Sequence, residues 1–141
     1  VHNSVKSINP KIKFGISPSG NPRLCAKGGL DIEKICNEGL VDYICPQIYW
    51  SLENKILPFE KVAKYWKDVV SKTNTNLYAG ISLYKLGTDA DGNTWNNDED
   101  ILKKEVEILE NLGYKETILY SLNQLDTSKK AIKKLQEKLE S

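Results

Sequence analysis

Residues 43–50 read YICPQIYW, an apolar run that ends in a glutamine and two aromatic residues. The run is nearly all apolar from Leu40 until Pro46, which is typical of a β-strand covered on both faces. Residues 58–72 follow with apolar side chains at helical spacing, including Trp66, which we expect in the core. This stretch predicts a buried strand over residues 40–50 that leads into an amphipathic helix.

The same succession of strand and helix occurs three more times along the chain. Further strands are predicted at residues 14–18, 77–84 and 117–123. Further helices are predicted at residues 4–8, 32–36, 98–109 and 128–139, the last with Thr127 or Ser128 as its cap. Equivalent strand positions return after roughly 30 to 40 residues, the length of one βαβ step.

Strands that alternate with helices indicate an α/β fold with a parallel sheet. Four βα units make half of a (β/α)8 TIM barrel. An open four-stranded parallel sheet with helices on both faces is the alternative, and periodicity does not separate the two. We treat residues 1–141 as a single, partial barrel domain. Because the chain begins at Val1, we expect it to be processed or excised from a longer chain.

Polar and aromatic side chains follow the predicted strands. In parallel α/β sheets, ligands bind beyond the carboxyl ends of the strands. The substrate-binding candidates at these ends are Ser17, Gln47, Tyr49, Trp50, Ser82, Tyr84, Tyr120 and Asn123. Alternation along the strand places Gln47 and Tyr49 on one face. Amides and hydroxyls bond to sugar hydroxyls, and aromatic rings stack on sugar rings, so this surface suits a hydroxyl-rich ligand.

The composition argues against several classes of partner. The chain has 20 Lys+Arg against 19 Asp+Glu, a net charge of +1, which gives no support for nucleic-acid binding. It has no apolar run long enough to span a membrane. It has no P-loop and no G-x-G-x-x-G motif, so we expect no nucleotide cofactor, and we rank binding of a phosphorylated ligand last.

The sequence also argues against a disulfide framework and a metal site. Three cysteines are an odd number, and His2 is the only histidine. Cys36 and Cys45 are expected in the core, whereas Cys25 is expected in a loop. Residues 89–93 partly match a calcium loop, but glycine occupies the first ligand position, so no metal is predicted.

Four segments resemble the glycosyl hydrolase-like 10 family. They are residues 13–18, 38–50, 77–85 and 95–101. The resemblance implies a bacterial glycosidase with a (β/α)8 barrel, of which every matched segment belongs to the C-terminal half. It implies a polysaccharide substrate, with bacterial cell-wall glycan leading, and an extracellular or cell-envelope location. The aromatic residue usual after the first segment is absent, and so is the half of the barrel with an aspartate-rich strand end.

Glycoside hydrolysis generally uses two carboxyl groups that flank the scissile bond. Glu53, just beyond Tyr49 and Trp50, is the acidic candidate for catalysis, although it also fits a solvated loop residue. Asp89 and Asp91 could reach a cleft, but a turn is the favoured interpretation. Trp95 is either a sugar platform or an anchor of its loop. We expect these residues alone to be inactive and the full-length protein to be the hydrolase.

Two hypotheses therefore stand. Either the chain is part of a glycoside hydrolase that cleaves a bacterial polysaccharide, or it is a non-catalytic carbohydrate-binding half-domain. A half barrel leaves two sheet edges unpaired, so we also predict that two copies form a homo-dimer through these edges, or that the isolated chain is only marginally stable.

Overall fold

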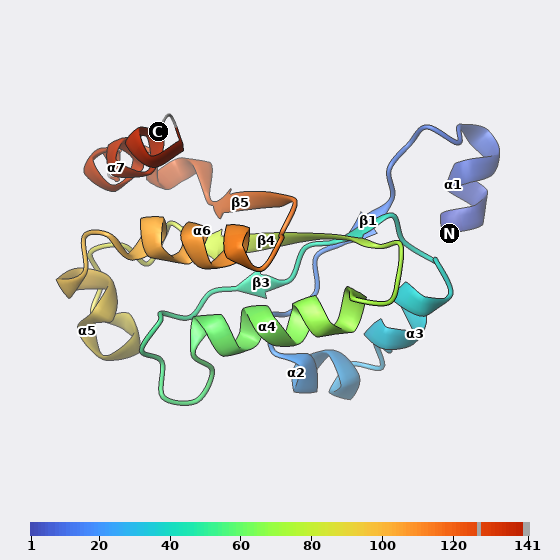
Figure 1. Ribbon diagram of the computed structural model, residues 1–141, viewed down its shortest axis with the longest axis horizontal. Coiled ribbons are helices and arrows are strands. Elements are labelled where there is room, and N and C mark those ends of the chain that lie inside the picture. Colours follow the sequence, from blue (N-terminus) through green and yellow to red (C-terminus); the bar gives the residue numbers. More distant parts are fainter. Residues whose placement is uncertain (127, 140–141) are drawn as a thin grey trace.

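The computed structural model describes residues 1–126 and 128–139 as an α/β fold with a parallel sheet (Figure 1). The strands are β1 (Gly15–Ile16), β2 (Tyr43–Ile44), β3 (Gln47–Ile48), β4 (Asn76–Ser82) and β5 (Glu116–Tyr120). β1 lies beside β2, both β2 and β3 pair with β4, and β5 also pairs with β4. Every pair is parallel, which confirms the predicted class. The predicted cap Thr127 lies outside the described residues.

The predicted strand over residues 40–50 is split into β2 and β3. Pro46 lies between them and has no N–H to donate to a neighbouring strand. The ladder nevertheless continues, because the Pro46 carbonyl accepts from Gly80 N at 3.0 Å and Gln47 N donates to the Pro18 carbonyl at 3.0 Å. β2 and β3 are therefore two pieces of one line of backbone, and the sheet follows the order of the chain.

The helices pack mostly along one side of the sheet. They are α1 (His2–Ile8), α2 (Pro22–Lys27), α3 (Ile32–Asn37), α4 (Phe59–Val70), α5 (Ala90–Asn97), α6 (Ile101–Asn111) and α7 (Lys129–Leu139), with a 3₁₀ helix at Leu122–Gln124. In chain order, α3 packs on α4, α4 on α6 and α6 on α7. Because α4 and α6 touch each other as well as β4, they cover the same face (Figure 1).

This one-sided succession of strands and helices forms an arc. Such an arc fits a segment of a barrel and also an open sheet with a single layer of helices, so closure into a barrel stays a prediction. Within the described residues, β1 and β5 each have one edge without a strand partner. Association of two copies through these edges likewise stays a prediction.

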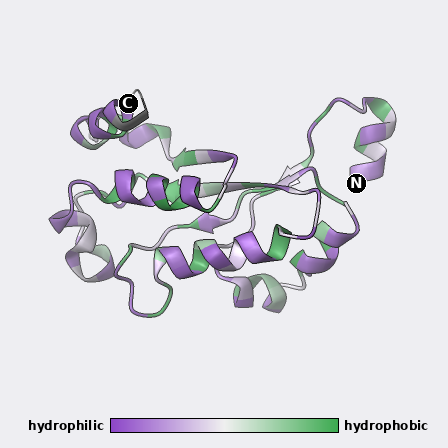
Figure 2. Ribbon diagram, in the orientation of Figure 1, coloured by the Kyte–Doolittle hydropathy of each residue, from purple (hydrophilic) through white to green (hydrophobic). Residues whose placement is uncertain are grey.

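The core lies between the sheet and this layer of helices. Ala79 and Ile81 of β4 are fully buried, and so are Phe59 and Trp66 of α4, as the spacing of residues 58–72 predicts. Hydrophobic and hydrophilic residues alternate along α4 and α6 in Figure 2, as expected of amphipathic helices. No helix in the described part of the chain is long and apolar enough to cross a membrane.

Two segments predicted as loops contain helices. α2 begins after Asn21, whose side chain accepts from Arg23 N at 3.0 Å, with Pro22 in the first turn. Cys25 therefore lies in a helix and is buried, which corrects its placement in a loop; like Cys36 and Cys45 it is a free thiol. α5 occupies part of the predicted loop over residues 85–97, and α6 begins at Ile101 rather than near residue 98.

Gly20 lies where the loop after β1 packs against β3. Its carbonyl accepts from Trp66 Nε1 at 2.9 Å. A Cβ atom at this position would lie 2.2 Å from the Gln47 carbonyl oxygen and 2.7 Å from the Trp50 ring. Only glycine allows the backbone to approach so closely. The loop after β1 therefore packs tightly against β3 and α4 because residue 20 has no side chain.

We predict that Gly20→Ala lowers the free energy of unfolding by about 1–3 kcal/mol, because the added methyl group forces the Gln47 backbone to move. Urea denaturation of the variant and the parent chain measures the difference. Gly28→Ala is the matched control, since its Cβ would lie 3.3 Å from its nearest neighbour. Equal unfolding midpoints for Gly20→Ala and the parent would contradict the packing argument.

Candidate functional site

Three tyrosines meet beyond the carboxyl ends of β3, β4 and β5. The Tyr49 ring stacks on the Tyr120 ring with centroids 5.7 Å apart and meets the Tyr84 ring edge-on at 5.8 Å. The Tyr84 and Tyr120 rings also meet edge-on, at 6.0 Å. These are ordinary geometries for favourable aromatic contacts. We call Tyr49, Tyr84 and Tyr120 the tyrosine cluster.

The register of the sheet brings the cluster together. Gln47 pairs with Gly80, and Ser82 pairs with Tyr120, so the ends of the strands are level. Tyr49 lies across Gly80, where a Cβ atom would sit 3.5 Å from the tyrosine ring. A Cβ atom there would make only an ordinary contact with the ring, so the level register of β3, β4 and β5 is what lets the Tyr49 ring reach Tyr120.

A separate pair of aromatic rings lies on the same face, nearer the amino ends of the strands. Tyr43 and Tyr78 stack with centroids 4.8 Å apart. Tyr43 lies over Gly15, where a Cβ atom would approach the ring to 2.5 Å. With the tyrosine cluster, this face carries five of the seven tyrosines of the chain.

The tyrosine cluster is partly open to solvent. Tyr120 is 54% exposed and Tyr84 40%. Burial raises the pKa of Tyr49 to about 12 and raises the pKa of Tyr84 above its ordinary value. Tyr49 and Tyr84 therefore keep their protons at neutral pH. They can donate and accept hydrogen bonds but cannot serve as bases there.

The other predicted binding residues are placed less uniformly. Gln47 Nε2 donates to the Ser17 carbonyl at 3.3 Å, and Ser17 Oγ donates to the Cys45 carbonyl at 2.9 Å, so this pair links the first two strand lines. Trp50 packs against the core beside Gly20. Ser82 is fully buried, and its hydroxyl has no partner within the described residues. Asn123 is exposed in the 3₁₀ helix after β5.

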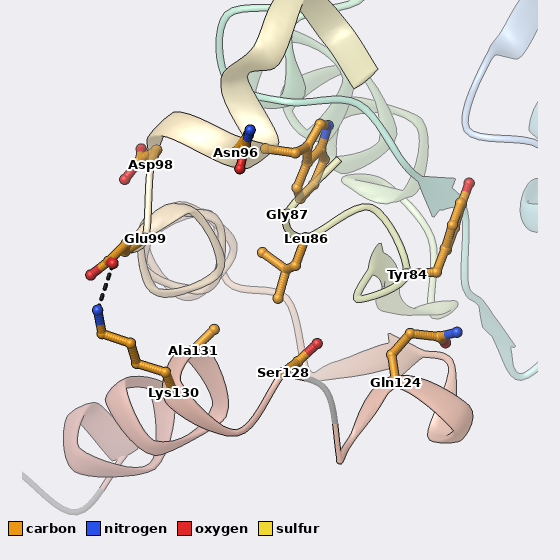
Figure 3. Close-up of a pocket in the computed structure, with 11 residues that line it drawn as sticks. Tyr84, Leu86, Gly87, Asn96, Asp98, Glu99, Gln124, Ser128, Lys130 and Ala131 are labelled. Carbon is orange, nitrogen blue, oxygen red and sulfur yellow. Dashed lines mark hydrogen bonds and ion pairs between the residues drawn. The ribbon is translucent and has the colours of Figure 1, made fainter. Parts of the chain in front are cut away.

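A pocket of about 350 Å³ opens beside Tyr84 (Figure 3). It lies between the loop that follows β4 and the segment that joins β5 to α7. Its other lining residues include Trp95, Asn96, Glu99, Gln124, Ser128 and Lys130. Apart from Trp95, the sequence analysis did not select these residues, because none lies at the end of a strand. Their positions in the segments that follow β4 and β5 were the available signal.

The carboxyl groups near the pocket are held by lysines. Asp98 Oδ2 lies 2.7 Å from Lys104 Nζ. Glu99 pairs with Lys130 and Lys134 of α7, and hydrogen bonds from these two lysines lower its pKa (Figure 3 shows the first pair). The two ion pairs of Glu99 join α7 to the segment that precedes α6. Both pocket carboxyls therefore already have lysine partners.

Glu53 and Asp89 lie in exposed segments. Glu53 is in the turn after β3, near enough to Lys104 for its charge to raise the pKa of that lysine, although Asp98 is the main cause. Asp89 precedes α5. No group of three or more His, Cys, Asp or Glu side chains in the described part of the chain is arranged to hold a metal ion.

Asp91 is half-buried, and its carboxylate is bonded to neighbouring groups rather than free in a cleft. Its carboxylate accepts from Ser51 N, Asn54 Nδ2 and Trp95 Nε1, each at 2.9 Å, and lies 3.6 Å from Lys85 Nζ. Burial opposes its ionisation, but the bonds from Trp95 and Ser51 and the charge of Lys85 together lower the pKa of Asp91. Trp95, which is almost fully buried, both anchors this loop and lines the pocket.

Comparison with known proteins relates the chain to glycosyl hydrolases. Residues 1–97 match the model of the family described as glycosyl hydrolase-like 10. The chain is 37% identical over 102 residues to the glycosyl hydrolase DigH of Escherichia coli, a match that covers 62% of this chain. It is 30% identical over 120 residues to the glycosyl hydrolase YngK of Bacillus subtilis, covering 74% of this chain. Each match spans only 23% of the relative's length.

Glu105 is a buried carboxyl on α6, near enough to Lys85, Asp91 and Asp98 for their charges to affect its pKa. It is 0% exposed, and neither of its oxygens has a hydrogen-bond partner within the described residues. Burial raises the pKa of Glu105 well above its ordinary value; the charge of Lys85 opposes this, and Asp91 and Asp98 reinforce it. The folded protein therefore carries this group in its neutral form at pH values where the unfolded chain ionises it.

We predict that the parent chain loses stability relative to Glu105→Gln as the pH rises above about 4.5, the ordinary pKa of this group. Above that value unfolding releases a proton from Glu105, so the free energy of unfolding falls by at most about 1.4 kcal/mol per pH unit. The glutamine variant has no such proton to release. Urea denaturation between pH 5 and 8 measures the difference.

Glu107→Gln, on the same helix at a half-exposed position, is the control and should follow the parent. If the stability difference between Glu105→Gln and the parent stays constant across this pH range, Glu105 is not held neutral in the fold.

Proposed function

This chain belongs to the glycosyl hydrolase-like 10 family, and from that membership we propose that its sheet supplies carbohydrate-binding subsites to a glycoside hydrolase. The observation that supports the proposal is the tyrosine cluster at the carboxyl ends of three strands, with a pocket beside it. Ligands of parallel α/β folds bind at this end of the sheet.

The chemistry of this surface suits sugars. Aromatic faces cover the C–H faces of a sugar ring, and neutral phenols exchange hydrogen bonds with its hydroxyl groups. The exposed rings of Tyr84 and Tyr120 offer both kinds of contact. The adjoining pocket, at about 350 Å³, lies near the small end of the size range of small-molecule sites.

We propose a bacterial polysaccharide as the substrate, with cell-wall glycan as the leading class. This places the protein outside the cell or in the cell envelope. We propose Glu53 as one catalytic carboxyl, since it follows the strand line that carries Tyr49. The second carboxyl is proposed to come from outside the 141 residues, because the pocket carboxyls Asp98 and Glu99 are held in ion pairs.

The second candidate is carbohydrate binding without catalysis. It is favoured by the neutral character of the cluster and by the exposed position of Glu53 in a turn. In that case the tyrosine cluster keeps its role, and no carboxyl of this chain takes part in bond cleavage.

We predict that Tyr120→Ala weakens binding of soluble cell-wall glycan fragments about tenfold, a loss of about 1.4 kcal/mol, because it removes an exposed stacking surface. Isothermal titration calorimetry measures the dissociation constant. Tyr65→Ala is the matched control: Tyr65 is also partly exposed, at 37%, but lies on α4. Equal affinity of the Tyr120 variant and the parent would remove the tyrosine cluster from the binding site.

We predict that Glu53→Gln in the full-length protein lowers kcat by about 100-fold or more while glycan binding persists, as expected for loss of a general acid or base. Hydrolysis of cell-wall glycan, followed by release of reducing ends, provides the assay. Glu60→Gln, at an exposed position of α4 paired with Lys64, is the control. Unchanged kcat would favour the second candidate or place the catalytic carboxyls elsewhere.

A further inference from the structure

Asp91 joins two loops that are far apart in the sequence. Its Oδ2 accepts from Ser51 N in the loop after β3 and from Trp95 Nε1 in α5, and its Oδ1 accepts from Asn54 Nδ2. Its side chain is only 12% exposed. Because both carboxylate oxygens are occupied, Asp91 is not available as an acid or base, and the proposed function leaves this residue without a role.

The backbone at Asp91 has an uncommon conformation. Asp91 has a φ of 51° and Asn93 a φ of 66°, with Gly92 between them at 71°. Left-handed φ values are unfavourable for most L-residues, although Asp and Asn tolerate them better than others. Such a turn persists where its surroundings hold it in place, and the three hydrogen bonds to the Asp91 carboxylate do so.

Lys85 connects Asp91 to the tyrosine cluster. Its ammonium group lies 3.6 Å from Asp91 Oδ2 and donates a hydrogen bond to the Tyr49 carbonyl. It also lies 5.9 Å from the centre of the Trp95 ring, and its side chain is 18% exposed. Lys85 directly follows Tyr84, whose backbone N–H donates to the Tyr120 carbonyl at 3.2 Å. One lysine therefore contacts the backbone of Tyr49 and adjoins that of Tyr84.

A mostly buried ammonium group is costly unless a carboxylate pairs with it. Asp91 supplies that carboxylate. We propose that Asp91 is a positioning residue, which holds Lys85 against the Tyr49 carbonyl and so sets the spacing of the tyrosine cluster for its carbohydrate ligand. The part concerning the ligand rests on the proposed function, whereas the part concerning the spacing does not.

The test is a double-mutant cycle on the parent chain, Asp91→Asn, Lys85→Met and both together. Asparagine tolerates the left-handed backbone, and its one amide oxygen can still accept from Ser51 N and Trp95 Nε1. Asp91→Asn therefore removes the charge together with the hydrogen bond from Asn54 Nδ2. Asp89→Asn makes the same chemical change at an exposed position two residues earlier. The readouts are the ring NMR shifts of Tyr49 and Tyr120, with Tyr65 as internal reference, and the affinity for cell-wall glycan fragments.

We expect Asp91→Asn and Lys85→Met to shift the same two tyrosine rings and to weaken glycan binding by about tenfold each. The double variant should be no worse than either single variant, because both act through one contact. Asp89→Asn should match the parent. Additive losses in the double variant, or tyrosine shifts and affinity unchanged in Asp91→Asn, would overturn the proposal.

Two further outcomes remain decisive. If Asp91→Asn does not fold, Lys85→Met alone decides, since unchanged Tyr49 and Tyr120 rings in that variant would overturn the positioning role. If the parent chain binds no glycan fragment, the proposed function fails at this site. The NMR cycle then still supports or overturns the control of ring spacing by Asp91.

Discussion

Burial of Leu77, Ala79 and Ile81 in the core with α4 and α6 is the interaction on which this structure depends. Side chains alternate along a strand, so this burial sends Tyr78, Gly80 and Ser82 of β4 to the opposite face. A slip of one residue in the register would exchange the two sets. The aromatic face of the sheet is thus a direct consequence of how its other face meets the helices.

The two faces are stabilised by different physics. Apolar contacts dominate the helix side, where Phe59 and Trp66 are fully buried. The tyrosine side is held by ring contacts, and Gly15 leaves room for the Tyr43 ring, since a Cβ atom there would lie 2.5 Å from it. Beyond the strand ends, charged groups make the main contacts. Asp91 binds the loop after β3 and pairs with Lys85. The tyrosine cluster therefore lies next to loops that are joined by an ion pair.

Local patterns were sufficient for much of the fold. The helical spacing of residues 58–72 correctly placed Trp66 in the core, and the fourfold alternation correctly indicated a parallel α/β sheet. The split at Pro46 was not recognised, although the missing N–H of proline explains it. α2 was also missed, even though Asn21 followed by Pro22 is a helix-start signal, because its glycine- and proline-rich surroundings also fit a loop.

The sequence by itself determined which residues stand at the ends of strands, because the period of two and the period of 3.6 are local properties. That was enough to select Tyr49, Tyr84 and Tyr120 separately. Only the tertiary structure decided that their rings meet, because contact across strands depends on the register of the sheet. It also decided that Asp91 binds Ser51 and Asn54, since a contact between residues about forty positions apart leaves no periodic trace in the chain.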